Sequence, residues 1–395
     1  MAYVNFKEEK FVAGNQLIKR KANNKKIREK MIKNKETLKN QFDETYSFKE
    51  TRDRIINNTS TLKENEFLEI CNKNIACADF VNCKFYNIKF KECTFIACNF
   101  EGCNFSGGGV SFENCSFIKV ETSKTPSLNI KDNLSCEFHN CKMYVKFLNC
   151  DISYMVIEEC FIHNTSFELT DMTALIVSNS QIKMINLTDV DLSNAKFVDN
   201  YIEDFEFNDK LKSKMDPKTF FDRIEFKKKT RDEYEGIYTI YENLANKFKE
   251  NNLKNNFGEY YYLCRCVQRK VLKPLPKIGS YIDWVSSGYG ERVIAPLITS
   301  LGIILLFAVL YLITGIEIEG EIIKVSVGTI SSIDIKTLIS YFNEALNLSI
   351  GFFASMGIIK AAPVSEMYIL SDIEVLVGVI MMGIGIGTLT RKFIR

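Results

Sequence analysis

The chain has 395 residues, of which 25% are charged and 46% hydrophobic. Its length exceeds that of a typical single domain of about 100 to 200 residues, so we expect several modules. The 51 lysines and arginines stand against 49 acidic residues, and this balance gives no global reason to expect nucleic acid as a partner.

The first 60 residues are locally basic, with 15 Lys/Arg and 8 Asp/Glu. Residues 1–65 are expected to form a charged N-terminal segment, helical and exposed from about residue 15 to 57 with breaks at Asn-Asn pairs. A solvated face is the plain interpretation of its charges. The alternative is contact with a membrane surface or a partner. The basic residues that would make this contact are Lys19, Arg20, Lys21, Lys25 and Lys26.

The 13 cysteines are expected to be free thiols. The first fifteen residues lack the apolar block of a signal peptide, which favours a reducing compartment. No pair has the spacing of a metal site: Cys264 and Cys266 are one residue apart, and His139 and His163 are the two histidines. We therefore expect no metal and no cofactor.

An internal repeat fills the middle of the chain, because large apolar residues recur at every fifth position. A small residue often stands two places earlier, as Cys93 does before Phe95. The phase shifts by two at Phe112 and is lost through a polar segment. The first run is Ile70, Ile75, Phe80, Phe85, Phe90, Phe95, Phe100, Phe105 and Val110, and the second is Phe147, Ile152, Ile157, Ile162, Phe167, Met172, Val177, Ile182, Leu187, Leu192, Phe197, Ile202 and Phe207.

A period of five fits neither an α-helix nor a strand, so the chain must turn once per repeat, with the large and the small residue pointing inward. These units resemble the pentapeptide-repeat family. The resemblance implies a right-handed quadrilateral β-helix of four repeats per coil over residues 66–210. Some members of the family mimic DNA with an acidic rod, but residues 68–210 carry only 20 acidic against 12 basic groups.

Residues 211–291 are expected to form a helical linker. Apolar and aromatic residues recur at helical spacing from Tyr234 to Phe248 and again from Phe257 to Val267, which predicts an antiparallel helical pair. Such a pair can cap the open end of the β-helix, whose edge strands need cover. Coupling of the repeats to the following module is the alternative, and the position in the chain favours both equally.

Residues 292–395 are expected to form an α-helical membrane domain with two spans. Residues 293–314 contain no charge and are long enough to cross the hydrocarbon core, and a second span is expected between residues 373 and 394. Arg292 precedes the first span and Arg391 ends the second, whereas the connecting loop is acidic. Positive residues on the inner side predict a multi-pass protein of the cell membrane with both termini in the cytoplasm.

The segment between the spans, residues 335–352, is amphipathic and too polar to cross as a third span, which predicts a re-entrant helix. This order of elements resembles the two-transmembrane pore-loop cation channels. The residues that match the family's ALxxSxxxFTTxGYGD-like pattern are Ala345, Leu346, Ser349, Ile350, Phe353, Ser355 and Gly357. The resemblance implies that the following residues line the filter: Ala354, Ser355, Met356, Gly357, Ile358, Ile359 and Lys360.

This loop departs from a potassium filter, in which successive carbonyls of a TVGYG-type sequence replace hydration water. The second glycine is missing, and Lys360 stands where the family has an acid. The GYGER sequence at 288–292 matches a filter superficially, but it precedes the first span and has no pore helix before it. Gly378 and Gly383 of the second span are candidates for a gating hinge, with close helix packing as the alternative.

The sequence therefore predicts a mixed fold: a pentapeptide-repeat β-helix, a helical linker and a two-span pore domain. The predicted function is a homotetrameric, cation-permeable channel for monovalent ions in a lipid bilayer, with an altered filter and a sensor for an unknown cytoplasmic protein or ligand. The alternative is a membrane-anchored scaffold that binds a protein partner without conduction. No catalytic motif indicates an enzyme.

Overall fold

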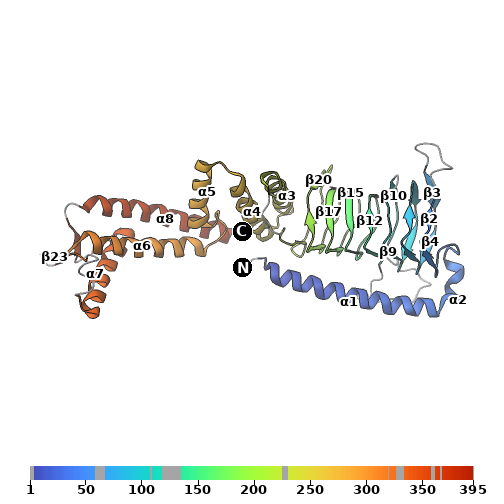
Figure 1. Ribbon diagram of the computed structural model, residues 1–395, viewed down its shortest axis with the longest axis horizontal. Coiled ribbons are helices and arrows are strands. Elements are labelled where there is room, and N and C mark those ends of the chain that lie inside the picture. Colours follow the sequence, from blue (N-terminus) through green and yellow to red (C-terminus); the bar gives the residue numbers. More distant parts are fainter. Residues whose placement is uncertain are drawn as a thin grey trace. The chain divides into compact units, whose positions relative to one another are not determined.

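The computed structural model describes residues 4–57, 67–106, 109–117, 135–224, 230–318, 320–325, 333–356, 361–364 and 367–394. The chain divides into two compact units, Met1–Val271 and Leu272–Arg395, which we call the repeat unit and the C-terminal unit. The repeat unit consists of a parallel β-solenoid with flanking helices, and the C-terminal unit is mainly helical (Figure 1).

Parallel strands of successive coils stack into sheets along the solenoid, which has about seven turns. One sheet contains β1 (Glu50–Arg52), β5 (Asp79–Val81), β9 (Asn99–Glu101), β11 (Glu137–His139), β14 (Val156–Glu158), β16 (Ile176–Ser178), β18 (Lys196–Val198) and β21 (Phe220–Phe221). A second contains β3 (Leu68–Cys71), β7 (Ile88–Lys91), β10 (Val110–Glu113), β12 (Lys142–Met143), β13 (Val145–Leu148), β15 (Phe161–Glu168), β17 (Gln181–Thr188), β19 (Tyr201–Ile202) and β20 (Phe205–Phe207). Two further pairs are β2 (Ile55–Ile56) with β6 (Lys84–Phe85) and β4 (Asn74–Ala76) with β8 (Thr94–Ile96).

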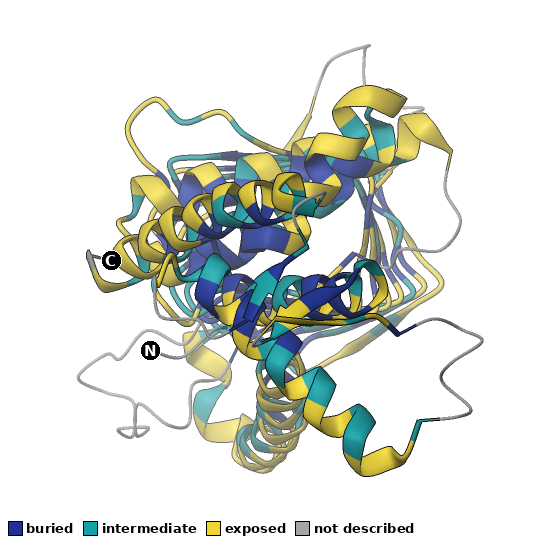
Figure 2. Ribbon diagram, turned by 90° about the vertical axis from the view of Figure 1, so that its left-hand side faces the viewer, coloured by how far each residue is buried: buried dark blue, intermediate teal, exposed yellow. Residues whose placement is uncertain are grey.

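The five-residue frame is confirmed as the inside of the solenoid. Phe80 pairs in register with Phe100, twenty residues or four repeats later, and their rings stack at 5.1 Å. Across the phase shift of two the spacing is 22 residues, since Phe90 stacks on Phe112 at 4.9 Å. Inward residues of the frame are buried, except that Ile70 and Phe207 at its two ends are partly buried, and many of the residues between them are more exposed (Figure 2). Columns of stacked side chains therefore form the core.

Many corners of the coil are turned by a residue with positive φ, two places after the inward residue. Asn82 has φ 53° and Asn87 has φ 46°, and the pattern recurs at five-residue spacing. Asparagine and glycine adopt this left-handed conformation at lower cost than other residues. The asparagines among the polar positions of the repeat therefore have a backbone role that the sequence analysis did not identify.

The solenoid begins before residue 66 and ends after residue 210, the boundaries expected for it. Residues 50–56, expected to be helical, form strands because β1 pairs with β5 and β2 pairs with β6. At the other end, β21 pairs with β18. The coil therefore extends into both flanking segments.

Helix α1 (Phe6–Lys33) continues through the Asn23-Asn24 pair, where the sequence predicted a break. It is followed by the short helices α2 (Lys35–Leu38) and η1 (Lys39–Gln41). Asn24 is buried and donates to the carboxylate of Glu137 at 2.8 Å, so tertiary contact compensates for its low helix propensity. The helix lies along the solenoid (Figure 1), with the Phe6 ring packed at a tilt against that of Phe220 and Arg28 paired with Asp79.

The predicted helical pair is formed by α3 (Arg231–Glu250) and α4 (Lys254–Val271). Thr230 and Glu233 make a capping box at the start of α3. The pair packs on the last coil, since the Tyr241 hydroxyl accepts from the Ile224 amide at 2.9 Å and the Tyr260 hydroxyl donates to the Phe221 carbonyl at 2.7 Å. The expected cap of the solenoid is therefore present.

The C-terminal unit contains the helices α5 (Pro274–Ser287), α6 (Ile294–Thr314), α7 (Ile335–Phe353) and α8 (Tyr368–Ile394). A small antiparallel sheet is formed by β22 (Ile316–Ile318), β23 (Glu321–Ile323) and β24 (Ala361–Pro363). By length and composition, α6 and the part of α8 from Tyr368 to Phe393 are long and apolar enough to cross a membrane.

Candidate functional site

The junction of α6, α7 and α8 is the part of the C-terminal unit that the sequence singled out. Asp334 begins α7 by accepting from the Lys336 amide at 3.2 Å. Ala345 and Leu348 lie fully buried on the face of α7 that packs with α6, opposite Ala308 and Tyr311. The amphipathic pattern of this segment therefore places one stripe against the first long helix.

The chain between the two long helices leaves one end of the helix pair and returns to it. Residues Ile316–Ile318, just after α6, pair with Ala361–Pro363, just before α8, so the end of α6 and the start of α8 lie at the same end of the unit. The C-terminal end of α7 lies deeper, because the Ser349 hydroxyl donates to the Ile304 carbonyl, ten residues before the end of α6, at 2.9 Å. At 1.5 Å per residue, this depth is about 15 Å.

A buried carboxyl group joins the three helices at this depth. Glu374 of α8 is fully buried and accepts from the Tyr311 hydroxyl of α6 at 2.7 Å. Its other carboxylate oxygen is hydrogen-bonded to the Ser349 hydroxyl of α7. Buried polar groups are retained where their hydrogen bonds are made, so this triad fixes α7 against both long helices.

The two candidate hinge glycines have different surroundings. A Cβ placed on Gly378 would lie 2.2 Å from the Phe353 carbonyl oxygen, so a glycine is needed where the end of α7 meets α8. A Cβ on Gly383 meets nothing within 4 Å. Helix α8 runs through both positions without a break. Close packing is thus present at Gly378, and a gating hinge at Gly378 or Gly383 stays a prediction.

The candidate filter is described only in its first three residues. Ala354 caps α7, Ser355 has φ 54°, and Met356 is 65% exposed. Gly357, Ile358, Ile359 and Lys360 lie outside the described residues. The structure therefore places the beginning of this loop directly after the C-terminal end of α7.

The GYGER sequence forms the turn between α5 and α6. Gly288 has φ 54° and caps α5, and Gly290 has φ 75°. The Tyr289 hydroxyl is buried and lies 2.9 Å from the Ser280 hydroxyl. A Cβ on Gly290 would lie 2.4 Å from Nη1 of Arg391, so the end of α8 packs over this turn. The glycines of this sequence therefore serve a helix–helix turn.

Some of the five basic residues of α1 that the sequence singled out contact the solenoid. Arg20 donates to the carbonyls of Tyr154 and Ala174 at 3.0 and 2.7 Å, and burial lowers the pKa of its guanidinium to about 10. Lys21 pairs with Glu158. Lys19, Lys25 and Lys26 are exposed. Two of the five residues are thus used for attachment of the helix, and contact of the remaining three with a partner stays a prediction.

All thirteen cysteines are free, and most are small inward residues beside the stacked rings. Cys93 and Cys103, for example, are each 1% exposed. Among the described residues, no group of three or more His, Cys, Asp or Glu side chains could hold a metal ion.

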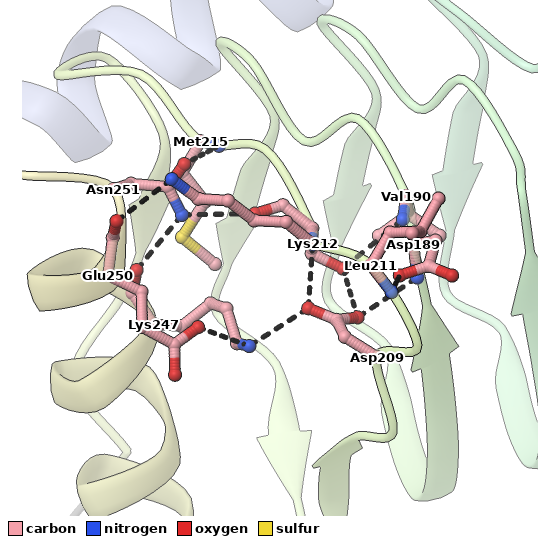
Figure 3. A network of polar contacts seen from close by, with 10 residues as sticks. Asp189, Val190, Asp209, Leu211, Lys212, Met215, Lys247, Glu250 and Asn251 are labelled. Carbon is pink, nitrogen blue, oxygen red and sulfur yellow. Dashed lines mark hydrogen bonds and ion pairs between the residues drawn. The ribbon is translucent and has the colours of Figure 1, made fainter.

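A polar network connects the last coil to α3 (Figure 3). Nζ of Lys247 donates to Asp209 at 2.9 Å and to Glu250 at 2.7 Å, and the Lys247 and Asp209 side chains are only 10% and 9% exposed. Asp209 also accepts from the Ser213 hydroxyl at 2.7 Å. Burial alone raises the pKa of Asp209, but Lys247 and the hydrogen bonds from Ser213 and the Asp189 amide lower it overall.

The sequence analysis did not single out Glu374, Asp209 or Lys247. An acidic residue within the second apolar stretch was the available signal for Glu374, since such a residue inside a membrane helix needs polar partners. Asp209 and Lys247 carry no motif, and only the fold brings them together.

Comparison with known proteins supports the repeat assignment. Residues 76–119 match the family described as pentapeptide repeats (9 copies). A structure of a trypsin-treated variant of QnrB1, a plasmid-mediated fluoroquinolone resistance protein, is similar at 16% identity with a TM-score of 0.17, over 37% of this chain and 80% of that one. Full-length QnrB1 matches at 14% identity and a TM-score of 0.13, over 42% and 94%. No curated protein matches the sequence. Residues 76–119 of the chain thus carry pentapeptide repeats.

Proposed function

We propose that the chain forms a homotetrameric ion channel of the cell membrane, in which α6 and α8 span the bilayer and the repeat unit lies in the cytoplasm. The observation that supports this proposal is that the chain between α6 and α8 returns to the end of the helix pair from which it left. The chain leaves α6 and enters α8 at the end marked by the β22–β24 pair, while Ser349 of α7 donates to the Ile304 carbonyl, farther along α6. If α6 and α8 span the bilayer, α7 ends in its interior. The loop that follows α7 is then tolerated there only if it is buried in protein or lines a water-filled path, such as a path for ions.

Assembly of several copies is part of the proposal, because two spans and one re-entrant helix cannot enclose a path. An apolar groove of about 820 Å³ between α6 and α7 supports it, with Val309, Leu338, Ile339 and Phe342 among its lining residues. Ile339 is 63% exposed there. The groove is expected to receive a helix of a neighbouring copy.

Permeation of monovalent cations with an altered filter is proposed from the loop sequence. Lys360 replaces an acid, so four copies near one axis would raise the energy of cations and weaken selectivity for potassium. Glu317 and Glu321 belong to the segment of the chain that connects the two long helices, and their negative charges could offset those of Lys360. The capped solenoid is proposed as the sensor for an unknown cytoplasmic protein or ligand.

Two measurements test the proposal: the release of potassium from liposomes tests conduction, and the mass of the assembly tests the number of copies. Full-length protein in liposomes should release trapped potassium, and native mass spectrometry in detergent should give four copies. Gly378→Val should displace the end of α7 from α8 and remove most of the flux. Gly387→Ala is the matched control, because a Cβ there meets nothing within 4 Å. Monomeric, non-conducting protein in intact liposomes would refute the proposal.

A membrane-anchored scaffold without conduction is the second candidate. The departure of residues 354–360 from the filter pattern favours it. In that case the flux is absent in wild type and in both glycine variants, although the protein is inserted. An enzymatic role is not proposed, since neither motifs nor the described side chains form a catalytic group.

A further inference from the structure

Helix α5, which precedes the first long helix, has an inverted distribution of side chains. Its large apolar residues are exposed: Leu275 is 82%, Ile278 58% and Ile282 64% exposed. Its packed side carries serines, since Ser280 and Ser287 are 8% and 6% exposed. A helix in water has the opposite arrangement, so the exposed side is suited to an apolar environment.

The exposed residues form one continuous stripe. Leu275, Ile278, Ile282 and Val285 are spaced by three, four and three positions, which places them on one helical face. The serines opposite are satisfied within the C-terminal unit. The Ser287 hydroxyl is 2.8 Å from Asp283, and the Ser280 hydroxyl is 2.9 Å from that of Tyr289. Rotation of the helix to bury the stripe would break the contact between Ser280 and Tyr289, which joins the helix to the following turn.

Charges around the stripe are sorted by sign. Lys273 is exposed at the start of the helix, and Lys277 is half-buried one turn later. The acids point inward, since Asp283 accepts from Ser287 and Glu291 is 4% exposed. The outer side of α5 is therefore apolar with cationic residues beside it.

The position of α5 relative to the long helices fits the boundary of a bilayer. Helix α5 runs across the direction of α6 and α8 (Figure 1). The Thr299 hydroxyl of α6 donates to the Val285 carbonyl at 2.7 Å, and Arg391 of α8 packs over Gly290. If α6 and α8 cross the membrane, α5 lies in its plane, at the end where α6 begins and α8 ends.

We infer that α5 is an interfacial helix whose apolar stripe enters the headgroup boundary and whose lysines bind anionic lipid headgroups. This inference rests on the proposed membrane location of α6 and α8. A helix with one apolar and one polar face lies in the interface, and the negative surface of the inner leaflet attracts nearby lysines. The occupant of the stripe is thus a lipid surface.

Tryptophan fluorescence can test this, because Trp284 is the single tryptophan of the chain. Trp284→Phe combined with Ile282→Trp moves the indole into the stripe, and Leu275→Trp in the same background does so nearer the start of the helix. In liposomes of phosphatidylcholine and phosphatidylglycerol, both indoles should emit at shorter wavelength and lose most of their emission to lipids brominated near the headgroup. Trp284→Phe combined with Lys142→Trp, on the exposed surface of the solenoid, should lose none.

Charge reversal tests the lipid class. Without phosphatidylglycerol, quenching of the Ile282→Trp indole should fall, and Lys273→Glu with Lys277→Glu should remove the difference between the two lipid mixtures. Extraction with alkaline carbonate separates the two proposals. Protein that is extracted refutes the membrane location itself. Protein that resists extraction, while the stripe indoles are not quenched by lipid, refutes only the inference on α5, as would occur if another copy or the repeat unit covered the stripe.

Discussion

Nζ of Lys247 and the carboxylate of Asp209 lie 2.9 Å apart and almost fully buried, and they join α3 to the last coil of the solenoid. Lys247→Met should destabilise the repeat unit by about 3 to 5 kcal/mol, because it leaves the Asp209 charge buried without its partner. Lys218→Met, at an exposed position near the same end, is the matched control and should change little. Thermal melting of the full-length protein in detergent measures both, and equal melting temperatures would contradict the role of the pair.

Acid should weaken the same junction. The folded-state pKa of Asp209 is lowered, so its contribution to stability is complete above the unfolded-state pKa of about 3.9 and is lost as the pH falls through the folded-state value. Burial alone lowers the pKa of Lys247, but Glu250 and Asp209 raise it overall. Its contribution is complete below about pH 10.4 and is lost above the folded-state value. Melting followed from pH 2 to pH 9 should show loss of stability below about pH 4 that is smaller in Lys247→Met.

The stacked core predicts a large effect of removing one ring. Phe95 is 2% exposed and stacks on Phe117 at 4.9 Å. Phe95→Ala should cost about 3 to 5 kcal/mol, through lost burial and the cavity that remains. Lys142→Ala changes an exposed residue of the same solenoid and should cost almost nothing. Chemical denaturation of the two variants is the comparison, and similar midpoints would mean that the frame does not form the core.

Periodicity made the solenoid predictable, because a period of five leaves few ways to bury every fifth side chain. The frame could also be extended across the phase shift, where Phe90 and Phe112 still stack. The ends were not predictable in this way. Ile55 and Ile56 form a strand only because Lys84 and Phe85 offer a partner, and such pairing leaves no periodic signal.

Close approach of α7 to α8 gives a prediction for glycine variants. Gly378→Ala should lower the thermal stability of the protein in detergent, because the new Cβ would lie 2.2 Å from the Phe353 carbonyl oxygen. Gly383→Ala has open space and replaces glycine within a helix, which should stabilise it by up to about 1 kcal/mol. Differential scanning fluorimetry separates them. A loss of stability at Gly383 as large as that at Gly378 would contradict the described packing.

The order of the helices in the candidate site was predictable from the sequence. The contacts between these helices were less predictable. Apolar length predicted α6 and α8, and amphipathicity predicted α7. The hydrogen-bond partners of Glu374 are Tyr311 and Ser349, which lie 63 and 25 residues away in the sequence. No local sequence pattern links residues so far apart. The exposed stripe of α5 also required the structure, since an apolar face in a sequence does not reveal whether it packs inside the protein.

The measurement that tests the central claim most directly is the reversal potential in planar bilayers with asymmetric potassium chloride. Purified wild-type protein should carry current, and Lys360→Asp should shift the reversal potential toward that of potassium, because it replaces positive charges at the proposed mouth. The shift should be largest near 10 mM salt, where the Debye length is about 30 Å. Silence of both proteins after verified insertion would contradict conduction, and current with an unchanged reversal potential would contradict the assignment of residues 354–360 as the filter.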